Sequence, residues 1–336
     1  MTTKTRYFLF GGASFLVLGL VGGMVAYHGV PAIGAFSGEP DELIYVPDDA
    51  AMVAFANVRE IMDSEVRQHV RQMLPPGSAA AADDGQRRLK EETGIDIEAD
   101  IDHVVAYVAP EQGAQSHSLM LARGRFDRPR IERLLQAHGA TIETYEGKRM
   151  IVRRSDALSL PKGDEHPEMA IAFVQPGLVA VGTGAAIRRS MDLESGRGSN
   201  ITANDEFMSQ VRDTDQGNAW AVGRFDRLAG QVRLPENLLR NLPPITYFAA
   251  SAQIDGGVSV KLRAEARDAQ AAQNLRDVIR GFIALGKLQT GAWPELQAVL
   301  QSLQLQADDK TVSLSFVLPS SALQAIARHR RTPNGQ

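Results

Sequence analysis

An uncharged apolar run near the N-terminus constrains this chain more than any other feature. Lys4 and Arg6 precede the run, and residues 8–27 then contain no charged side chain. A helix of about 20 apolar residues crosses the hydrocarbon core of a bilayer. The sequence therefore predicts a transmembrane helix. Residues 1–27 would form a cytoplasmic stub and the anchor, and residues 28–41 a tether interrupted by glycine and proline.

Charges on the two sides of the run predict its orientation. Lys4 and Arg6 lie on the N-terminal side, whereas the next lysine or arginine after the run is Arg59. Because basic residues concentrate on the cytoplasmic side of membrane helices, the N-terminus is expected in the cytoplasm. We therefore predict a single-pass protein of the bacterial inner (cytoplasmic) membrane whose C-terminal domain lies in the periplasm.

A cleaved secretory signal is the alternative interpretation of the same residues. The apolar region of a signal peptide is about 7–15 residues long and ends at small residues. Ala32 and Ala35 each end a short run that a signal peptidase could cut. The greater length of the apolar run favours an uncleaved anchor. The bilayer itself is then the first predicted partner, through residues 8–27.

Composition narrows the classes of function. The formal net charge is −4, whereas a nucleic-acid-binding domain presents a basic face, so no nucleic-acid partner is predicted. The chain has no cysteine. This absence excludes disulfides, a thiol nucleophile and zinc held by cysteine.

Strands, helices and hairpins alternate through the rest of the chain. Apolar runs that lead into amphipathic stretches predict strand–helix units, and alternating runs around glycine- or aspartate-containing turns predict β-hairpins. The predicted strand–helix units are residues 52–57 with 58–74, 119–126 with 129–138, 219–225 with a short helix, and 313–318 with 320–329. The predicted hairpins are residues 141–145 with 149–154, 169–174 with 178–182, 246–254 with 258–266, and 303–307 with 311–317. A further core-facing helix is predicted at residues 268–285.

Short connections between strands indicate antiparallel pairing. We therefore predict an α+β fold in which helices pack on one side of large antiparallel sheets. The pentapeptide Gly-Arg-Phe-Asp-Arg occurs at residues 124–128 and 223–227, where Asp127 and Asp226 are expected to cap the helices that follow. This repeat indicates two duplicated halves. The halves are residues 42–200 and 201–336.

The start of the predicted extracytoplasmic part resembles a group of exported bacterial proteins of unknown function. In that group a Pro-x-Asp-Ala step, here at Pro47, precedes a first strand, and an Asn-Val-Arg step, here at Asn57, precedes a helix. The later segments that begin at Thr93 and Asp100 are similar to the same group. The resemblance implies an exported, membrane-anchored, non-catalytic protein and brings no active-site residue with it.

The closest approach to a nucleotide-binding loop is Gly182-Thr183-Gly184, before an expected helix at residues 185–193. A dinucleotide loop needs a third glycine, and Ile187 stands in its place. The strand before the loop belongs to an expected hairpin and not to a βαβ unit. We therefore predict a structural turn.

Acidic and histidine side chains show no recognised metal site. Asp96, Glu98, Asp100 and Asp102 follow one another at alternate positions, but the run lacks the glycine and the closing glutamate of a calcium loop. No two histidines have the spacing of a zinc-binding helix, and the loop around His166 is expected to be a charged loop tip. We predict no catalytic, cofactor-binding or metal-binding residue, and no cofactor.

These observations predict a membrane-anchored periplasmic binding or scaffold protein that is not an enzyme. Its partner is expected to be another envelope or membrane protein, and the oligomeric state stays open. The alternatives are an envelope enzyme whose site is assembled only in the folded protein, and a carrier of a lipid or other apolar ligand. An exposed apolar patch would favour the scaffold, an internal apolar cavity the carrier, and a cleft with carboxylates and histidine the enzyme.

Protease added to intact spheroplasts tests the predicted topology. Because the domain is expected outside the cytoplasm, the chain beyond the tether should be digested while a cytoplasmic control protein stays intact. Complete protection of the domain until the inner membrane is lysed would contradict the predicted orientation.

Overall fold

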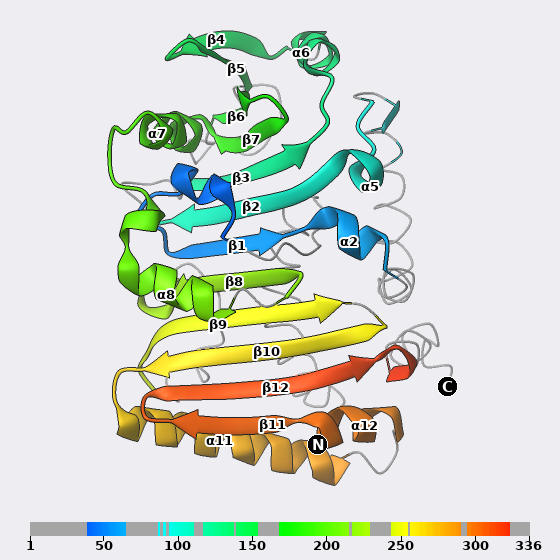
Figure 1. Ribbon diagram of the computed structural model, residues 1–336, viewed down its shortest axis with the longest axis vertical. Coiled ribbons are helices and arrows are strands. Elements are labelled where there is room, and N and C mark those ends of the chain that lie inside the picture. The colour runs from blue at the N-terminus through cyan, green and yellow to red at the C-terminus, as the bar shows by residue number, and fades with distance from the viewer. Residues whose placement is uncertain are drawn as a thin grey trace, which may run out of the picture.

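The computed structural model describes residues 39–64, 87, 90–91, 94–110, 117–137, 139–153, 168–214, 217–228, 243–254, 256–289 and 294–322. These residues form one antiparallel sheet of 12 strands together with helices, which confirms the predicted α+β class (Figure 1). The predicted anchor lies outside the described residues. No helix within them is long and apolar enough to span a membrane.

The sheet runs continuously in the order β11-β12-β10-β9-β8-β1-β2-β3-β7-β6-β5-β4. Its strands are β1 (Met52–Ala56), β2 (Ile101–Ala109), β3 (His117–Gly124), β4 (Thr141–Tyr145), β5 (Lys148–Arg153), β6 (Met169–Gln175), β7 (Leu178–Thr183), β8 (Ala219–Arg224), β9 (Ile245–Ile254), β10 (Gly257–Ala266), β11 (Gln304–Asp308) and β12 (Thr311–Pro319). All four predicted hairpins are present as neighbouring strand pairs.

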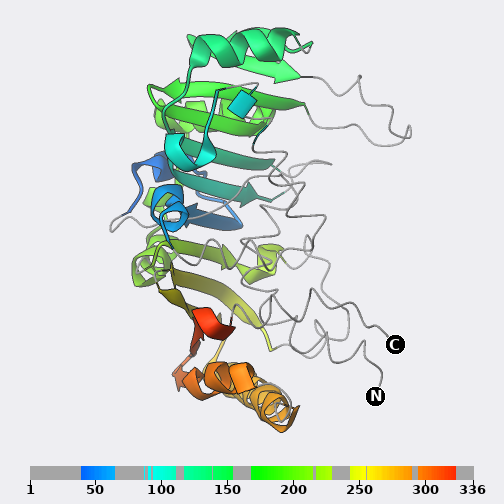
Figure 2. The same ribbon diagram turned by 90° about the vertical axis from the view of Figure 1, so that its right-hand side faces the viewer.

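The described helical elements surround this sheet. They are η1 (Asp41–Tyr45), α2 (Val58–Met62), α5 (Ile97–Asp100), α6 (Arg128–Ala137), α7 (Gly184–Glu194), η3 (Ile201–Ala203), α8 (Asp205–Thr214), α9 (Phe225–Leu228), α11 (Ala269–Gln289) and α12 (Pro294–Ser302). Seen edge-on in Figure 2, the strands stack into a long twisted wall with α11 and α12 at one end.

The pairing of β1 with β8 lies at the centre of a symmetric strand order. Outward from β1 come β2, β3, β7 and β6, and outward from β8 come β9, β10, β12 and β11. On each side, the third strand has as its neighbour the second strand of the last hairpin: β3 lies beside β7, followed by β6, and β10 lies beside β12, followed by β11. Only the β1 side continues with a further hairpin, β5 and β4.

One row of side chains across the sheet follows the same symmetry. Ala54 lies opposite Ala221 at the centre of the row. On either side an alanine comes next, followed by three larger apolar residues. From one side to the other the row is Ile171, Val181, Met120, Ala106, Ala54, Ala221, Ala250, Leu262, Leu314 and Leu305.

Helices cover parts of both faces, so the prediction of helices on one side only is wrong. The front face, which includes Val53 and Phe55, packs against η1, α7, η3 and α8 in the largest core cluster. The back face, which includes Ala54 and Leu262, packs against α2, α9, α11 and α12 in four smaller clusters. The physical reason is that β1 and β8 are apolar at successive positions, so both of their faces need cover. The alternation that suggested a single buried face occurs in β10, at the outer part of the sheet.

The shared pentapeptide marks a local turn in the described fold. Its copies lie at the ends of β3 and β8. In the symmetric strand order, however, β8 corresponds to β1 and not to β3, so the two copies do not occupy equivalent places. The two copies also cap differently. Asp127 accepts a hydrogen bond from the Arg130 amide at 3.0 Å, as an N-cap does. Asp226 is instead the second residue of α9, so its predicted capping role is wrong.

Replacing Gly182 of β7 tests how closely β3 and β7 are packed. A Cβ atom there would press on the carbonyl oxygen of Ser118 and lie 3.1 Å from Cα of Leu119, and backbone atoms cannot move aside cheaply. Gly182→Ala should therefore lower the free energy of unfolding by about 1–3 kcal/mol in urea denaturation. The control is Gly256→Ala, where a Cβ atom meets nothing within 4 Å. Equal stabilities of the two variants would contradict the close approach.

Candidate functional site

The chain joins the front face of the sheet through residues 39–50, which we call the strap. The strap begins with a tight turn in which the Leu43 amide donates to the Pro40 carbonyl at 3.0 Å. Leu43, Tyr45 and Val46 are at most 1% exposed and belong to the front core. Burial of large apolar side chains, at roughly 1.5–3 kcal/mol each, holds the strap against the sheet.

Glu42 in the middle of η1 joins two basic side chains on the sheet. One carboxylate oxygen lies 2.7 Å from Nη2 of Arg123, and the other lies 3.0 Å from Nε2 of His103. The register of β2 and β3 places His103 and Arg123 opposite each other. The Glu42 side chain is only 3% exposed. The three residues form a charge cluster around a buried carboxylate, which we call the Glu42 cluster.

Two opposing effects set the pKa of Glu42. Burial raises it, because a charged carboxylate loses its hydration. The hydrogen bond and charge of His103 and the hydrogen bond from Arg123 outweigh burial and lower the pKa to about 2. A carboxylate with a lowered pKa stabilises the folded state at neutral pH and loses that effect as acid protonates it.

Further bonds tie the strap to elements on both sides of the β1–β8 pair. The Ile201 amide donates to the Val46 carbonyl at 2.7 Å, so the strap contacts η3. The Asp49 carboxylate accepts from Arg189 of α7 at 2.9 Å, and its carbonyl accepts from Arg227 of α9 at 2.7 Å. Because α7 follows β7 and α9 follows β8, the strap connects the two sides of the sheet.

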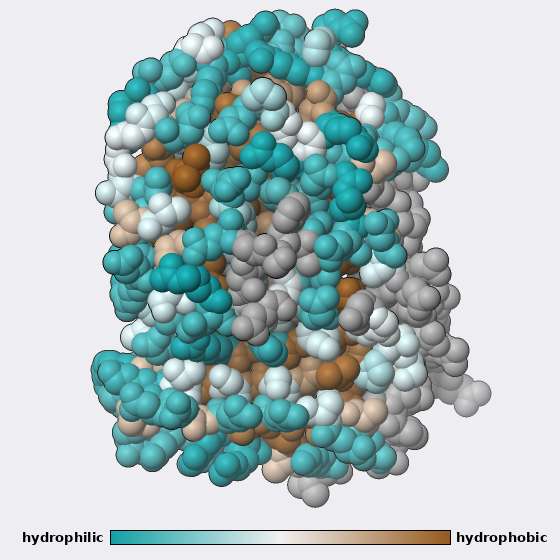
Figure 3. Space-filling view, viewed as in Figure 1, coloured by the Kyte–Doolittle hydropathy of each residue, from teal (hydrophilic) through white to brown (hydrophobic). Residues whose placement is uncertain are grey.

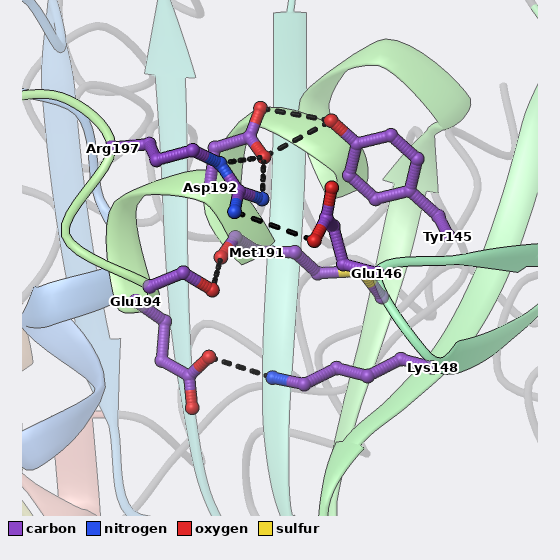
Figure 4. Close-up of polar contacts among 8 residues, drawn as sticks. Tyr145, Glu146, Lys148, Met191, Asp192, Glu194 and Arg197 are labelled. Atoms are coloured by element: carbon purple, nitrogen blue, oxygen red, sulfur yellow. Dashed lines mark hydrogen bonds and ion pairs between the residues drawn. The ribbon is translucent and has the colours of Figure 1, made fainter.

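A second polar cluster fastens the β4–β5 hairpin to the end of α7 (Figure 4). The Tyr145 hydroxyl lies 3.0 Å from both carboxylate oxygens of Asp192, and Arg197 binds Asp192 at 2.6 Å. Lys148 of β5 pairs with Glu194 at 2.7 Å. The hydrogen bond to Asp192 raises the pKa of Tyr145, which keeps the hydroxyl protonated as a donor. We call these residues the hairpin cluster.

Neither cluster has the geometry of an accessible catalytic site. A general acid or base must come within hydrogen-bond reach of a substrate proton. The Glu42 carboxylate is closed between η1 and the sheet and is already bound by two basic groups. In the hairpin cluster, Asp192 and Glu194 are bound by their own partners. Both clusters are therefore arranged to hold elements together.

The acidic run from Asp96 to Asp102 is divided among separate ion pairs. Asp96, Asp100 and Asp102 pair with Lys90, Arg125 and Arg59 respectively. Within the described ranges, no three His, Asp or Glu side chains are grouped so that they could hold a metal ion. His166 and its loop lie outside the described residues, and so does the side chain of Glu98.

The glycines at residues 182 and 184 lie at a strand-to-helix turn in an antiparallel hairpin. β7 ends at Thr183, whose side chain accepts from the Ala186 amide at 3.2 Å and caps α7. The Gly184 amide donates to the Glu168 carbonyl at 2.9 Å. Gly184 does not have a positive φ; a Cβ atom there would press on the Glu168 carboxylate. The turn thus lacks the parallel βαβ setting of a dinucleotide loop.

The sequence contained a usable signal for the Glu42 cluster. His103 shares one face of β2 with Val105 and Tyr107, and Arg123 shares one face of β3 with Leu121, so both basic residues alternate with buried apolar ones. Basic side chains on a core face require an acidic partner. What the sequence could not indicate is that this partner, Glu42, comes from the segment before the first strand.

The two faces of the sheet differ in how completely they are covered. On the front face of the central strands, Val53, Tyr107 and Ala180 are at most 1% exposed. Figure 3 looks onto this side, and hydrophilic side chains cover most of the view. On the back face, apolar residues of the same strands remain partly exposed. They are Ala54, Ala106, Met120, Ile171, Phe173, Val181, Ala250, Ala252, Leu262 and Phe316.

Comparisons with known proteins identify no relative of this chain. No family model, no curated protein and no solved structure matches it.

Replacing Glu42 tests the Glu42 cluster through the pH dependence of stability. The lowered pKa means that the contribution of Glu42 is fully present above the ordinary glutamate pKa and declines as the pH falls toward 2. Glu42→Gln should therefore lower the free energy of unfolding at pH 6 by about 3 kcal/mol. The gap to the unmodified protein should shrink steadily between about pH 5 and pH 2.

Urea denaturation at several pH values measures this gap. The matched control is Glu146→Gln in the turn between β4 and β5, because Glu146 is 49% exposed and pairs with Arg197 at 3.3 Å. That change should cost less than about 1 kcal/mol. A Glu42→Gln gap that is the same at pH 6 and pH 3 would contradict the cluster as described.

Proposed function

We propose that this protein is a single-pass, membrane-anchored periplasmic binding or scaffold protein whose back face receives a polypeptide partner. The observation that carries the proposal is the contrast between the two faces. Over the central strands, the front face is closed by its own helices and serves as the core. On the back face, apolar residues of eight strands stay partly exposed. A partner can contact these side chains.

The chemistry of the back face favours a protein partner. Each of the ten interior strands has a neighbour on both sides, so their main-chain groups are occupied within the sheet. A partner is thus recognised by apolar side-chain contact and shape. The alanines at the centre of the row are smaller than the residues on both sides, so they form a shallow depression at the centre of the back face. Extended apolar surface on a folded domain marks protein or membrane interaction sites and ligand-binding grooves.

The carrier of an apolar ligand is the second candidate, and the same face supports it. A lipid chain would use the same partly exposed apolar residues and would need no hydrogen bonds. A carrier, however, encloses most of the surface of its ligand. The enzyme alternative receives no support from the Glu42 cluster, because its carboxylate is buried and already paired with two basic side chains.

The symmetric strand order supports a further proposal, that the sheet arose by duplication. The two series of strands correspond one to one from β1 and β8 outward, and the central row repeats the same change from alanine to larger residues. In this account the β4–β5 hairpin is an addition to the first copy. The support comes from the strand order and not from the repeated pentapeptide.

Single cysteines test the proposed use of the back face, because the natural chain has none. We expect Ala250→Cys on the back face to react with a maleimide in the purified full-length protein. The same cysteine should react several-fold more slowly in native membranes, where the partner is present. Ala180→Cys on the closed front face should be unreactive in both.

Ser259→Cys is the matched surface control, because Ser259 is exposed on the opposite face of the neighbouring strand β10. Its labelling should be the same in both preparations. Equal labelling of Ala250→Cys before and after purification would contradict a partner on the back face. Competition by added fatty acid in place of a protein would favour the carrier.

A further inference from the structure

We propose that the outer edge of β4 is a docking site for an extended segment of another protein. The segment adds one more strand to the sheet, and its side chains alternate between basic and apolar. This edge is separate from the back face, so the site depends neither on the proposed use of that face nor on the membrane anchor.

β4 is the last strand of the sheet and has β5 as its one neighbour. The two strands form a hairpin whose turn consists of Glu146 and Gly147, both with positive φ. In a hairpin with such a two-residue turn, the residues that flank the turn are hydrogen-bonded to each other. Tyr145 and Lys148 therefore form the closing pair.

The closing pair determines which main-chain groups of β4 face outward. In an antiparallel ladder, every second residue bonds to the neighbouring strand. Thr141, Glu143 and Tyr145 therefore bond to β5, and the amide and carbonyl groups of Ile142 and Thr144 point away from the sheet. Such a row of outward groups is a template for pairing with another chain.

The two edges of the sheet differ in their protection. At the opposite end, α11 lies along β11 (Figure 1), and Leu305 of β11 packs against the core cluster to which α11 contributes Leu275. Natural edges are blunted by a helix, a proline or a bulge. Within the described part of the chain, β4 has a regular register and no proline. α6 lies near β4 but is bound to β5, through Glu132 and Arg149 at 2.9 Å.

The hairpin is held firmly although its edge is open. Side chains on its front side bind successive turns of α7, two of them drawn in Figure 4. The pairs are Glu143 with Arg188 at 2.9 Å, Tyr145 with Asp192 at 3.0 Å, and Lys148 with Glu194 at 2.7 Å. An edge that is already ordered loses little conformational freedom when a partner strand binds.

Charge on the front side of the hairpin favours a basic partner. Two arginines there are shared by twice as many carboxylates. Arg188 lies between Glu143 and Glu168, and Arg197 lies between Glu146 and Asp192. The excess negative charge is accessible, because the side chains of Glu143 and Glu146 are 38% and 49% exposed. Basic side chains on the front side of an added strand would balance it.

The back side of the same edge is apolar. Ile142 is partly exposed there and lies opposite the buried Ile151 of β5. Because successive side chains of a strand point to opposite faces, an added strand needs apolar residues at the positions between its basic ones. This alternation is the chemistry that defines the partner.

A second copy of this chain fits the edge less well. Two β4 strands that paired through all of their outward groups would place the two Glu143 side chains opposite each other, and like charges at such positions are unfavourable. β11 of a second copy brings Gln304, Gln306 and Asp308 to the front side, none of which is basic. The charge pattern thus favours a different polypeptide.

Peptide binding to the full-length protein in detergent tests the inference. The probe is a short, capped, dye-labelled peptide in which lysine and valine alternate, and its binding is read by fluorescence anisotropy. A second peptide has glutamate in place of lysine. Thr144→Pro removes one outward amide, and proline is tolerated on an edge strand where the amide faces solvent. The matched control is Thr144→Val, which keeps the main-chain group. Circular dichroism checks that each variant is folded.

We expect the lysine peptide to bind the unmodified protein and Thr144→Val equally well. Its binding to Thr144→Pro should be roughly tenfold weaker, the upper end of the effect of one lost hydrogen bond. The glutamate peptide should bind the unmodified protein weakly. Absence of binding by the lysine peptide, or equal binding to a folded Thr144→Pro protein, would overturn the inference. So would self-association that Thr144→Pro abolishes, because the occupant would then be a second copy.

Should Thr144→Pro fail to fold, hydrogen exchange of the unmodified protein replaces it. The outward amides of Ile142 and Thr144 should exchange fast in the free protein and slow down when the lysine peptide is added. The amides of Glu143 and Tyr145, which already bond to β5, serve as the internal control. Unchanged exchange at Ile142 and Thr144 under saturating peptide would likewise overturn the inference.

Discussion

The structure depends on the antiparallel pairing of β1 with β8. Five residue pairs, from Met52 with Gly223 to Ala56 with Ala219, join two series of strands into one sheet. Phe55 and Trp220 stack across this pairing on the front face, with ring centroids 5.8 Å apart. On the back face the same strands present alanines. The pairing thus creates both the sealed front core and the low centre of the back face.

The sequence predicted the local elements well because their signals are local. Residues 141–145 were expected as a strand and form β4. The helix expected at residues 268–285 is α11, whose first turn is capped by Asp268 through a 2.8 Å bond to the Ala271 amide. Turn residues and apolar periodicity carry this information within a few positions.

Long-range arrangement was beyond the sequence signals. Nothing in β3 and β7 indicates that they are neighbours across a span of more than fifty residues, although the close approach at Gly182 depends on it. The need for cover on both faces was readable from the unbroken apolar run of β1, but the alternation in β10 pointed to a single buried face. α8 was not predicted, although Phe207 and Val211 have helical spacing.

Of the candidate sites, the glycine turn lies in an antiparallel hairpin and the acidic run is divided among ion pairs, whereas the Glu42 cluster was not foreseen. Its three residues lie in the strap, β2 and β3, so only the fold brings them together. The cluster matters because it fixes the strap to the sheet. Through the strap, contacts reach α7 on one side of the β1–β8 pair and α9 on the other.

Hydrogen exchange of the amides in β1 and β8 tests most directly whether two series of strands form one cooperative sheet around this pairing. Amides buried at the centre of a single sheet exchange only when the whole domain unfolds. The account predicts that the slowest amides of both strands exchange with the same free energy of opening, equal to that of global unfolding. Fast exchange along β1 and β8, or clearly different opening free energies for the two strands, would show two separable units and contradict the account.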